Sequence, residues 1–316
     1  MKRFLFVIGA LLAAGVACDR EPCADCREEL AAHHVCLDAD DAHSVLYVFS
    51  RTGALVDSYG APDGLFDFYL TDEIYDFVVV AGKDDLPRTG VTKPDLFALS
   101  SLLSDNADGR FVMVGALSDH LVEADEKITV EVRRLIAKVT CTIRTDFKGA
   151  LARKPFWVED LYLTNVTGSC PLAATDHRPA SEALWFNRMD LEDPPQPGCP
   201  FALLYGHIDR PMAASDSLVC APSLYAYPNA SPDSHDRSRW GSRCTRVVVK
   251  ARLGDRTTYY PVTLEEVRPN HHYHVDLTIS NYGVEHPEDP ISAYAGVAAA
   301  VSLAPWGDGG VLEGRY

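Results

Sequence analysis

Cys18 is the residue with the most recognisable chemistry in this sequence, because an export signal leads directly to it. Lys2 and Arg3 form a short basic start, and residues 4–17 are an uninterrupted apolar run that ends in small residues. Such a run is too short to span a bilayer and is typical of a secretory signal peptide. A cysteine at the cleavage point is the mark of bacterial lipoproteins, whose cysteine sulfur is diacylated. We predict a signal peptide over residues 1–17 and lipid on Cys18; a plain secretory signal is the alternative.

The predicted lipid sets the location and limits the partners. Two or three acyl chains on one residue give stable anchoring, so we expect residues 18–32 to be a lipidated leader and the body to face outward from the cell outer membrane. The formal net charge of the whole chain is −16. A surface this acidic repels nucleic acid and anionic lipid, which excludes nucleic acid as a partner.

Histidines could supply metal ligands in residues 271–274, which read His-His-Tyr-His. On a strand, His272 and His274 would project from one face, and two imidazoles can ligate a metal when a carboxylate joins them. We expect instead the polar start of a strand after Pro269, and we predict no metal and no cofactor. A metal-dependent hydrolase remains an alternative that needs a third ligand near this pair.

Enzymatic motifs are missing from the sequence. It has no Gly-x-Ser-x-Gly elbow, His-Glu-x-x-His pair, phosphate loop or dinucleotide fingerprint. Aspartate and glutamate are scattered through turns, so no catalytic pair can be selected. We therefore predict no catalytic residues and a protein that is not an enzyme.

Cysteines beyond Cys18 suggest crosslinking. The chain has nine cysteines, and the even number that remains in an exported chain favours disulfides of undecidable connectivity. Cys23 and Cys26 have the spacing of a redox motif or half a zinc site. They lie in the polar leader, and no second closely spaced pair follows, so we expect a structural disulfide there.

Aromatic residues could form a carbohydrate platform, and a surface glycan-binding β-sandwich lipoprotein is the alternative function. At strand alternation such residues are more often core or cross-strand pairs. The candidates are Tyr225, Tyr227, Tyr259, Tyr260 and Trp306.

Apolar residues alternate with a period of two along most of the chain, which predicts short strands. In residues 44–49, Val45, Tyr47 and Phe49 would share one face and Leu46 and Val48 the other, as in a strand buried on both sides. The expected strands are residues 33–39, 44–49, 54–59, 65–70, 75–81, 110–114, 127–132, 135–143, 156–166, 201–205, 218–227, 245–253, 257–264, 272–279 and 297–303.

One helix is expected, over residues 95–103, with Lys93-Pro94-Asp95 at its start and leucines along one face. Residues 168–243 are rich in proline and read as long loops. Strands at intervals of about 8–15 residues without intervening helices predict an all-β protein of antiparallel β-sandwiches. The boundary near residues 133–136 divides it into an N-terminal β-sandwich at 33–134 and a C-terminal one at 135–316.

The order of motifs resembles the fimbrillin superfamily, the lipoprotein-derived subunits of type V fimbriae in Gram-negative anaerobes. The resemblance implies two transthyretin-like antiparallel β-sandwich (Greek-key) domains, with one short helix in the first, and a role in fimbrial assembly or anchoring. The segments that carry it are residues 44–53, 111–115 with 128–139, 224–229 with 259–262 and 269–275, and 287–290 leading to 301–306.

Members of this superfamily join by strand addition, in which a strand of one subunit completes a sandwich of its neighbour. In shaft subunits an arginine-specific protease removes the leading strand. Here no arginine or lysine lies between the first expected strand and Arg51, while Arg20 and Arg27 lie upstream. We therefore expect a lipid-anchored anchor, assembly or accessory subunit that keeps its leading strand. Its partners would be other fimbrial subunits, the outer membrane through Cys18 and a possible surface receptor in adhesion.

Overall fold

The structure is a computed structural model that describes residues 31–37, 44–61, 64–71, 73–123, 127–173, 185–186, 198–235, 242–291 and 296–307. Strands dominate this part of the chain. The helical elements of the described ranges are two short α-helices and two 3-10 helices, α1 (Lys93–Ala98), α2 (Phe201–Leu204), η1 (Leu103–Gly109) and η2 (Leu151–Arg153). The all-β class is confirmed. None of the helices in the described ranges has the length and apolarity needed to cross a membrane.

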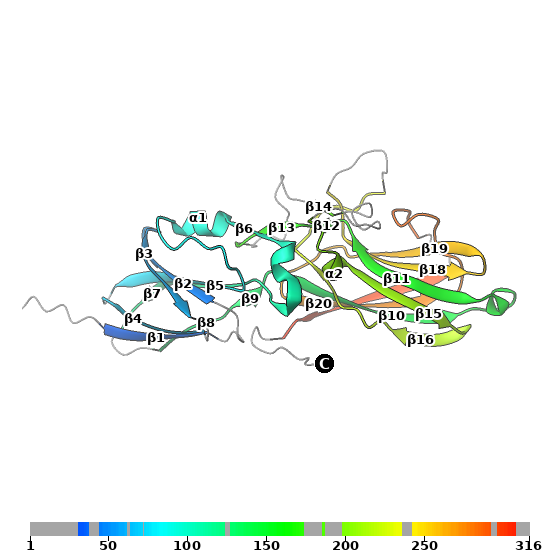
Figure 1. The fold of residues 1–316 in the computed structure, drawn as a ribbon, viewed down its shortest axis with the longest axis horizontal. Helices are drawn as coiled ribbons and strands as arrows, with labels where there is room; N and C mark the ends of the chain where they lie inside the picture. Colours follow the sequence, from blue (N-terminus) through cyan, green and yellow to red (C-terminus); the bar gives the residue numbers. More distant parts are fainter. Residues whose placement is uncertain are drawn as a thin grey trace, which may run out of the picture.

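The first β-sandwich pairs a five-stranded sheet with a three-stranded sheet (Figure 1). The large sheet has the order β3-β2-β5-β7-β9, and the small one the order β4-β1-β8. The strands of the large sheet are β2 (Ser44–Ser50), β3 (Leu55–Ala61), β5 (Ile74–Ala81), β7 (Met113–Leu121) and β9 (Arg133–Arg134). Those of the small sheet are β1 (Ala31–Leu37), β4 (Leu65–Leu70) and β8 (Lys127–Val130).

Strand β2 is buried on both faces, as its sequence predicts. Leu46 and Val48 pack in the core between the two sheets of the first sandwich. Val45, Tyr47 and Phe49 face the other way, into a larger core that continues into the second half of the molecule. One apolar core therefore joins the two sandwiches across their junction.

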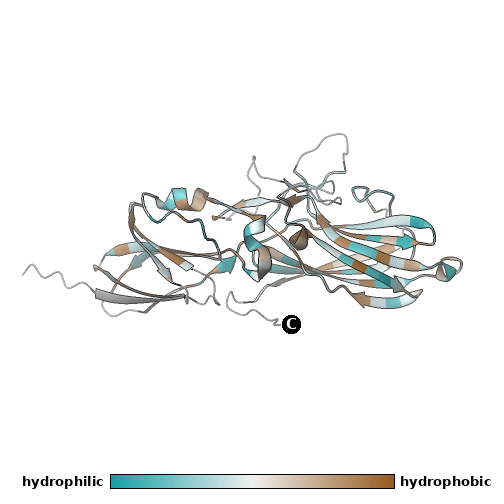
Figure 2. Cartoon of the chain, viewed as in Figure 1, coloured by the Kyte–Doolittle hydropathy of each residue, from teal (hydrophilic) through white to brown (hydrophobic). Residues whose placement is uncertain are grey.

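The second sandwich has two sheets of its own, which enclose most of the larger core. In Figure 2 its strands alternate between hydrophobic and hydrophilic residues along their length. One sheet has the order β15-β11-β18-β19: β15 (Tyr205–Met212), β11 (Phe156–Thr164), β18 (Arg246–Leu253) and β19 (Arg256–Thr263). The other has the order β16-β10-β20-β21, with β17 also on β10: β16 (Ser215–Val219), β10 (Ala137–Asp146), β20 (His271–Ile279), β21 (Val297–Pro305) and β17 (Leu224–Ala226).

Two strand pairs are parallel, which differs from the purely antiparallel arrangement expected. Strand β1 runs parallel to β8, and β10 runs parallel to β20. Parallel neighbours need a long connection between them, and in both cases most of a domain intervenes in the chain. Alternation alone reports burial and carries no information about strand direction.

The helix predicted over residues 95–103 starts as expected but ends early. Thr92 caps it by accepting a hydrogen bond from the Asp95 amide, and the Asp95 side chain bonds back in a capping box. Leu99 is already extended, with ψ of 136°. The chain then forms β6 (Ser100–Leu102), which pairs with β13 (Ser169–Pro171). This pairing links segments of the two sandwiches. It stabilises the extended backbone of residues 100–102, although the spacing of the leucines favours a helix there.

The region predicted as long loops contains more structure than expected. Besides β13, its described parts form β14 (Trp185–Phe186), which pairs with β12 (Val166–Thr167) just before the region, and the whole of β15. The strand expected at residues 201–205 is instead helix α2, which runs directly into β15.

Candidate assembly site

Strand β1 occupies the middle of the small sheet of the first sandwich. It pairs antiparallel with β4, from Ala31 opposite Leu70 to Cys36 opposite Leu65. It pairs parallel with β8, from His34 beside Lys127 to Leu37 beside Val130. The leading strand therefore closes the small sheet and separates β4 from β8 (Figure 1).

The small sheet covers an apolar floor. The buried side chains that β4 and β8 contribute are Phe66, Phe68, Leu70, Ile128 and Val130, each no more than 5% exposed. Without β1, the facing backbone groups of β4 and β8 would lose their hydrogen-bond partners. That combination of unpaired backbone and apolar floor is what strand addition requires.

Strand β21 forms an edge of the second sandwich. It pairs with β20 along its whole length, from Val297 opposite Ile279 to Pro305 opposite His271. In the described part of the chain no strand pairs with its outer side. Its residues are almost all exposed, and none of them is charged. Natural edges are usually protected by charges, bulges or prolines, and here only Pro305 gives that protection.

Trp306 fastens the end of β21 to the junction of the two sandwiches. Its amide donates to the Asn270 carbonyl at 2.9 Å. The Arg134 guanidinium lies 4.6 Å from the Trp306 ring centre and donates to its carbonyl oxygen at 3.1 Å. Phe111 and Tyr225 also pack against the indole. The C-terminal edge is therefore tied to β9 of the first sandwich.

The predicted histidine pair lies on one face of β20, as expected. His272 Nε2 and His274 Nδ1 lie 2.7 and 2.9 Å from the same hydroxyl, that of Thr140 on β10. Burial lowers the pKa of His272. Within the described ranges, no group of three histidine, cysteine or acidic residues could hold a metal ion. The pair forms a polar contact between two parallel strands.

The proposed carbohydrate platform does not assemble. Tyr227 and Tyr260 are fully buried. Tyr225 and Trp306 stack on each other at the domain junction, whereas Tyr259 lies on β19, where its amide bonds to the Val284 carbonyl. With two of the five residues buried and Tyr259 on a different strand from the stacked pair, the five aromatic side chains do not form one exposed platform.

Cysteine pairing differs from the expectation. Five cysteines lie in the described ranges with their side chains, and the structure joins none of them in a disulfide: Cys141, Cys170, Cys199, Cys220 and Cys244. The predicted Cys23–Cys26 bridge and the lipidated Cys18, like the signal peptide, lie outside the described residues.

Asp160 is the centre of a polar cluster that sequence reasoning missed. A register shift in β11 places this residue, 6% exposed, among side chains of the neighbouring strands. It accepts hydrogen bonds from the Tyr205 hydroxyl, from Lys250 at 3.2 Å and from His207 at 2.9 Å. Burial alone would raise the pKa of Asp160, but these hydrogen bonds outweigh it and hold the pKa below its ordinary value. No local motif joins residues so distant in sequence.

We expect His207 to titrate above its ordinary pKa of 6.5, because its hydrogen bond to Asp160 stabilises the imidazolium. The folded state then binds the proton more tightly than the unfolded state. Its contribution to stability is present below about pH 6.5 and is lost as the pH rises through the folded pKa. An NMR titration should show the midpoint falling in Asp160→Asn and far less in Asp209→Asn. Equal midpoints in the wild type and Asp160→Asn would contradict the assignment.

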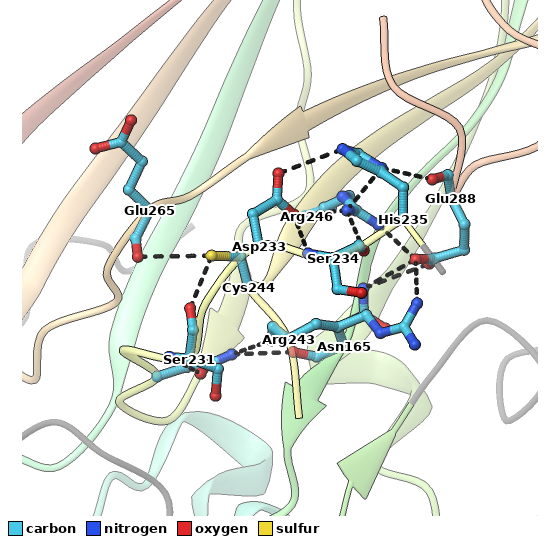
Figure 3. Close-up of polar contacts among 11 residues, drawn as sticks. Asn165, Ser231, Asp233, Ser234, His235, Arg243, Cys244, Arg246, Glu265 and Glu288 are labelled. Atoms are coloured by element: carbon cyan, nitrogen blue, oxygen red, sulfur yellow. Dashed lines mark hydrogen bonds and ion pairs between the residues drawn. The ribbon is translucent and has the colours of Figure 1, made fainter. Parts of the chain in front are cut away.

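A second polar cluster surrounds Arg246, the first residue of β18 (Figure 3). Arg246, which is fully buried, donates to Glu288 and, at 2.7 Å, to Asp233. Arg243 and Asn165 also reach the Glu288 carboxylate, each at 3.4 Å. The cluster fastens the loops around residues 233 and 288 to β18. The charged side chains of the cluster pair with and neutralise one another, which indicates a structural role.

Comparison with solved structures shows where this architecture occurs. A Bacteroides eggerthii DSM 20697 protein with a proposed role in cell adhesion is 17% identical, with 88% of this chain and 96% of that chain covered and a TM-score of 0.62. The fimbrilin FimA of Porphyromonas gingivalis W83 is 13% identical, with 87% and 97% covered and a TM-score of 0.60. The tip fimbrial protein Mfa3 of Porphyromonas gingivalis, with a C-terminal truncation, is 13% identical, with 87% and 99% covered and a TM-score of 0.53.

Comparison of sequences finds no relatives, whereas comparison of structures does. No family model matches the sequence, and no curated protein matches it either. At identities this low, the likeness concerns the backbone arrangement, and it extends over both sandwiches. The chain therefore shares the fold of these solved proteins over both of its sandwiches.

Proposed function

We propose that this protein is a non-enzymatic structural subunit of a cell-surface type V fimbrium, held in the outer membrane by lipid on Cys18. It acts as an anchor, assembly or accessory subunit, joins neighbouring subunits by β-strand addition and supports adhesion. Likeness in fold to the fimbrilin FimA and to the tip fimbrial protein Mfa3 supports the fimbrial role. The apolar run that ends at Cys18 supports the anchor.

The main support for the anchor role is the position of β1 in its sheet, together with the lack of basic residues between β1 and β2. The strand lies between β4 and β8, and residues 31–50 contain neither lysine nor arginine. A trypsin-like protease therefore has no site at which to separate β1 from β2. Cleavage after Arg27 would release the lipidated leader and leave β1 in its sheet. A subunit whose slot stays filled by its own strand cannot accept a neighbour's strand there.

The edge of β21 is the surface on which we expect a neighbour's strand to add. Its outer backbone groups have no strand partner in the described part of the chain, and Val301 and Leu303 are 42% and 46% exposed. A strand added alongside would pair with this backbone and cover these side chains. Acceptance at this edge fits better than donation, because Trp306 holds the end of β21 to Arg134 and Asn270.

The two sandwiches would act as separate domains, at residues 33–134 and 135–316. Strand β9 is the last strand of the first sandwich's large sheet, and β10 is the first strand of the second sandwich. The short link between them supports a boundary near residues 133–136. The core that crosses the junction would hold the domains in one orientation.

Mapping the N-terminus of protein taken from assembled fimbriae tests this function. We expect a mature chain that begins at Cys18 and carries acyl chains on that residue, measured by mass spectrometry of the N-terminal peptide. The Cys18→Ala variant, which offers no sulfur to acylate, is the matched control and should carry no lipid. A mature chain that begins after Arg51 would mean that β1 is removed, and this would make the protein a shaft-type subunit.

A further inference from the structure

Two thiols lie opposite each other at the edge of the second sandwich. Strands β10 and β16 pair antiparallel, with Thr142 opposite Val219 and Ile143 opposite Leu218. One step further along this register, Cys141 lies opposite Cys220, and the Cys220 amide donates to the Cys141 carbonyl at 2.9 Å. Residues directly opposite in such a pair point to the same face of the sheet. Both cysteines are buried, at 1% and 5% exposure, and both belong to the larger core.

This arrangement meets the steric demand of a disulfide. Opposed residues joined by ladder hydrogen bonds have Cα atoms about 5.5 Å apart, and disulfides span Cα separations of about 4.4–6.8 Å. The two thiols also contact each other. The hydrogen bond from the Cys141 thiol lowers the pKa of Cys220, and the same hydrogen bond, together with burial, raises the pKa of Cys141.

We propose that Cys141 and Cys220 form a cross-strand disulfide in the exported protein, which fastens the edge strand β16 to β10. The inference rests on the export that the proposed function includes, because disulfides persist outside the cytosol. In the described ranges β16 has β10 as its one strand neighbour. The adjacent Val219 is 73% exposed. A covalent bond at Cys220, directly after the end of this strand, would keep the strand from fraying.

The oxidation requires an oxidant that carries a disulfide, of the thiol–disulfide oxidoreductase class. The Cys220 thiolate attacks one sulfur of the oxidant's disulfide and forms a mixed disulfide, and the oxidant's other sulfur leaves as a thiolate. The Cys141 thiolate then attacks the Cys220 sulfur, and the oxidant is released as a dithiol. Two electrons pass to the oxidant's sulfurs, and the two protons of the cysteines end on its thiols. Burial of both thiols in the fold places this exchange before β16 closes over the core.

Cys244 provides a contrast within the same sandwich. It is also buried, at 3% exposure. Its thiol donates to the Ser231 carbonyl at 2.9 Å and approaches the Glu265 carbonyl at 3.7 Å (Figure 3). With backbone carbonyls as its neighbours, we expect Cys244 to stay a thiol, which makes it the matched control.

The test is to unfold and reduce the full-length chain, refold it in a glutathione redox buffer, and trap thiols with N-ethylmaleimide before digestion without reduction. We expect the Cys141 and Cys220 peptides to be joined, with a mass lower by two hydrogens and separation on reduction. Cys244→Ser should keep the joined peptides, and Cys220→Ser should leave Cys141 labelled. Maleimide on both Cys141 and Cys220, or pairing of either with another cysteine, would overturn the proposal.

Melting temperature provides a second readout if a serine variant folds poorly. Reductant should lower the melting temperature of the refolded wild-type protein and of Cys244→Ala, and should leave that of Cys220→Ala unchanged. An equal response of wild type and Cys220→Ala would count against the bond. Because the buffer supplies the oxidant, both readouts are independent of where the cell places the protein. Failure of the N-terminal mapping would refute the anchor role and leave this pairing intact.

Discussion

Replacing Glu288 with alanine is expected to lower the free energy of unfolding by about 3–5 kcal/mol, because two buried arginines lose their shared carboxylate. The Arg246 and Arg243 side chains are 1% and 4% exposed, and the Glu288 side chain is 9% exposed. Water cannot replace the carboxylate at this depth, so the charges are left poorly compensated. Glu288→Gln keeps an acceptor of the same shape without the charge, and should fall between the alanine variant and the wild type.

Urea unfolding followed by circular dichroism measures this effect, and Glu285→Ala is the matched control. Glu285 also pairs with an arginine, Arg256, at 2.5 Å, but its side chain is 81% exposed. An ion pair in water contributes about 0–1 kcal/mol, so the control should remain close to the wild type. A Glu288→Ala variant as stable as Glu285→Ala would show that the buried cluster does not stabilise the fold.

Deleting residues 31–37 is expected to destabilise the first sandwich by more than about 5 kcal/mol, since exposing each large apolar side chain costs roughly 1.5–3 kcal/mol. The deletion removes the middle strand of the small sheet and uncovers the floor that includes Phe66, Phe68 and Ile128. A synthetic peptide of residues 29–39, added to the deleted chain, should restore the melting temperature, because it can occupy the slot between β4 and β8.

The matched control is the same peptide with Val35→Pro. In β1, Val35 pairs with both Phe66 on β4 and Ile128 on β8. Proline at this position lacks the amide that a central strand needs, so this peptide should bind weakly or not at all. Equal rescue by both peptides, or a deleted chain as stable as the full one, would show that β1 is not an integral strand of the sandwich.

Local patterns in the sequence were enough for the class of fold. The alternation in residues 44–50 predicts a strand buried on both faces, and each of its apolar side chains lies in the core expected for it. The start of α1 was also readable from Lys93-Pro94-Asp95, and in the structure Thr92 and Asp95 form a capping box there. Such features depend on neighbours in the chain, which the sequence specifies directly.

Features that depend on distant partners were missed or placed wrongly. Residues 99–103 were expected to continue the helix, yet Ser100–Leu102 form β6 because they pair with β13, which lies far along the chain. The parallel pairing of β10 with β20 is likewise a matter of which strands meet, and alternation is the same for both directions. Asp160 and Glu288 gained their partners only when strands and loops from several parts of the chain converged.

Sequence alone was enough for the strand-rich class and for the burial of β2 on both faces, because each depends on consecutive residues that repeat with a fixed period. The folded arrangement was needed to see that β1 fills the middle of a sheet, that the edge of β21 is exposed and that Cys141 faces Cys220. The physical reason is that strand pairing is set by register between distant segments. A shift of one residue exchanges the two faces of a strand without changing its pattern.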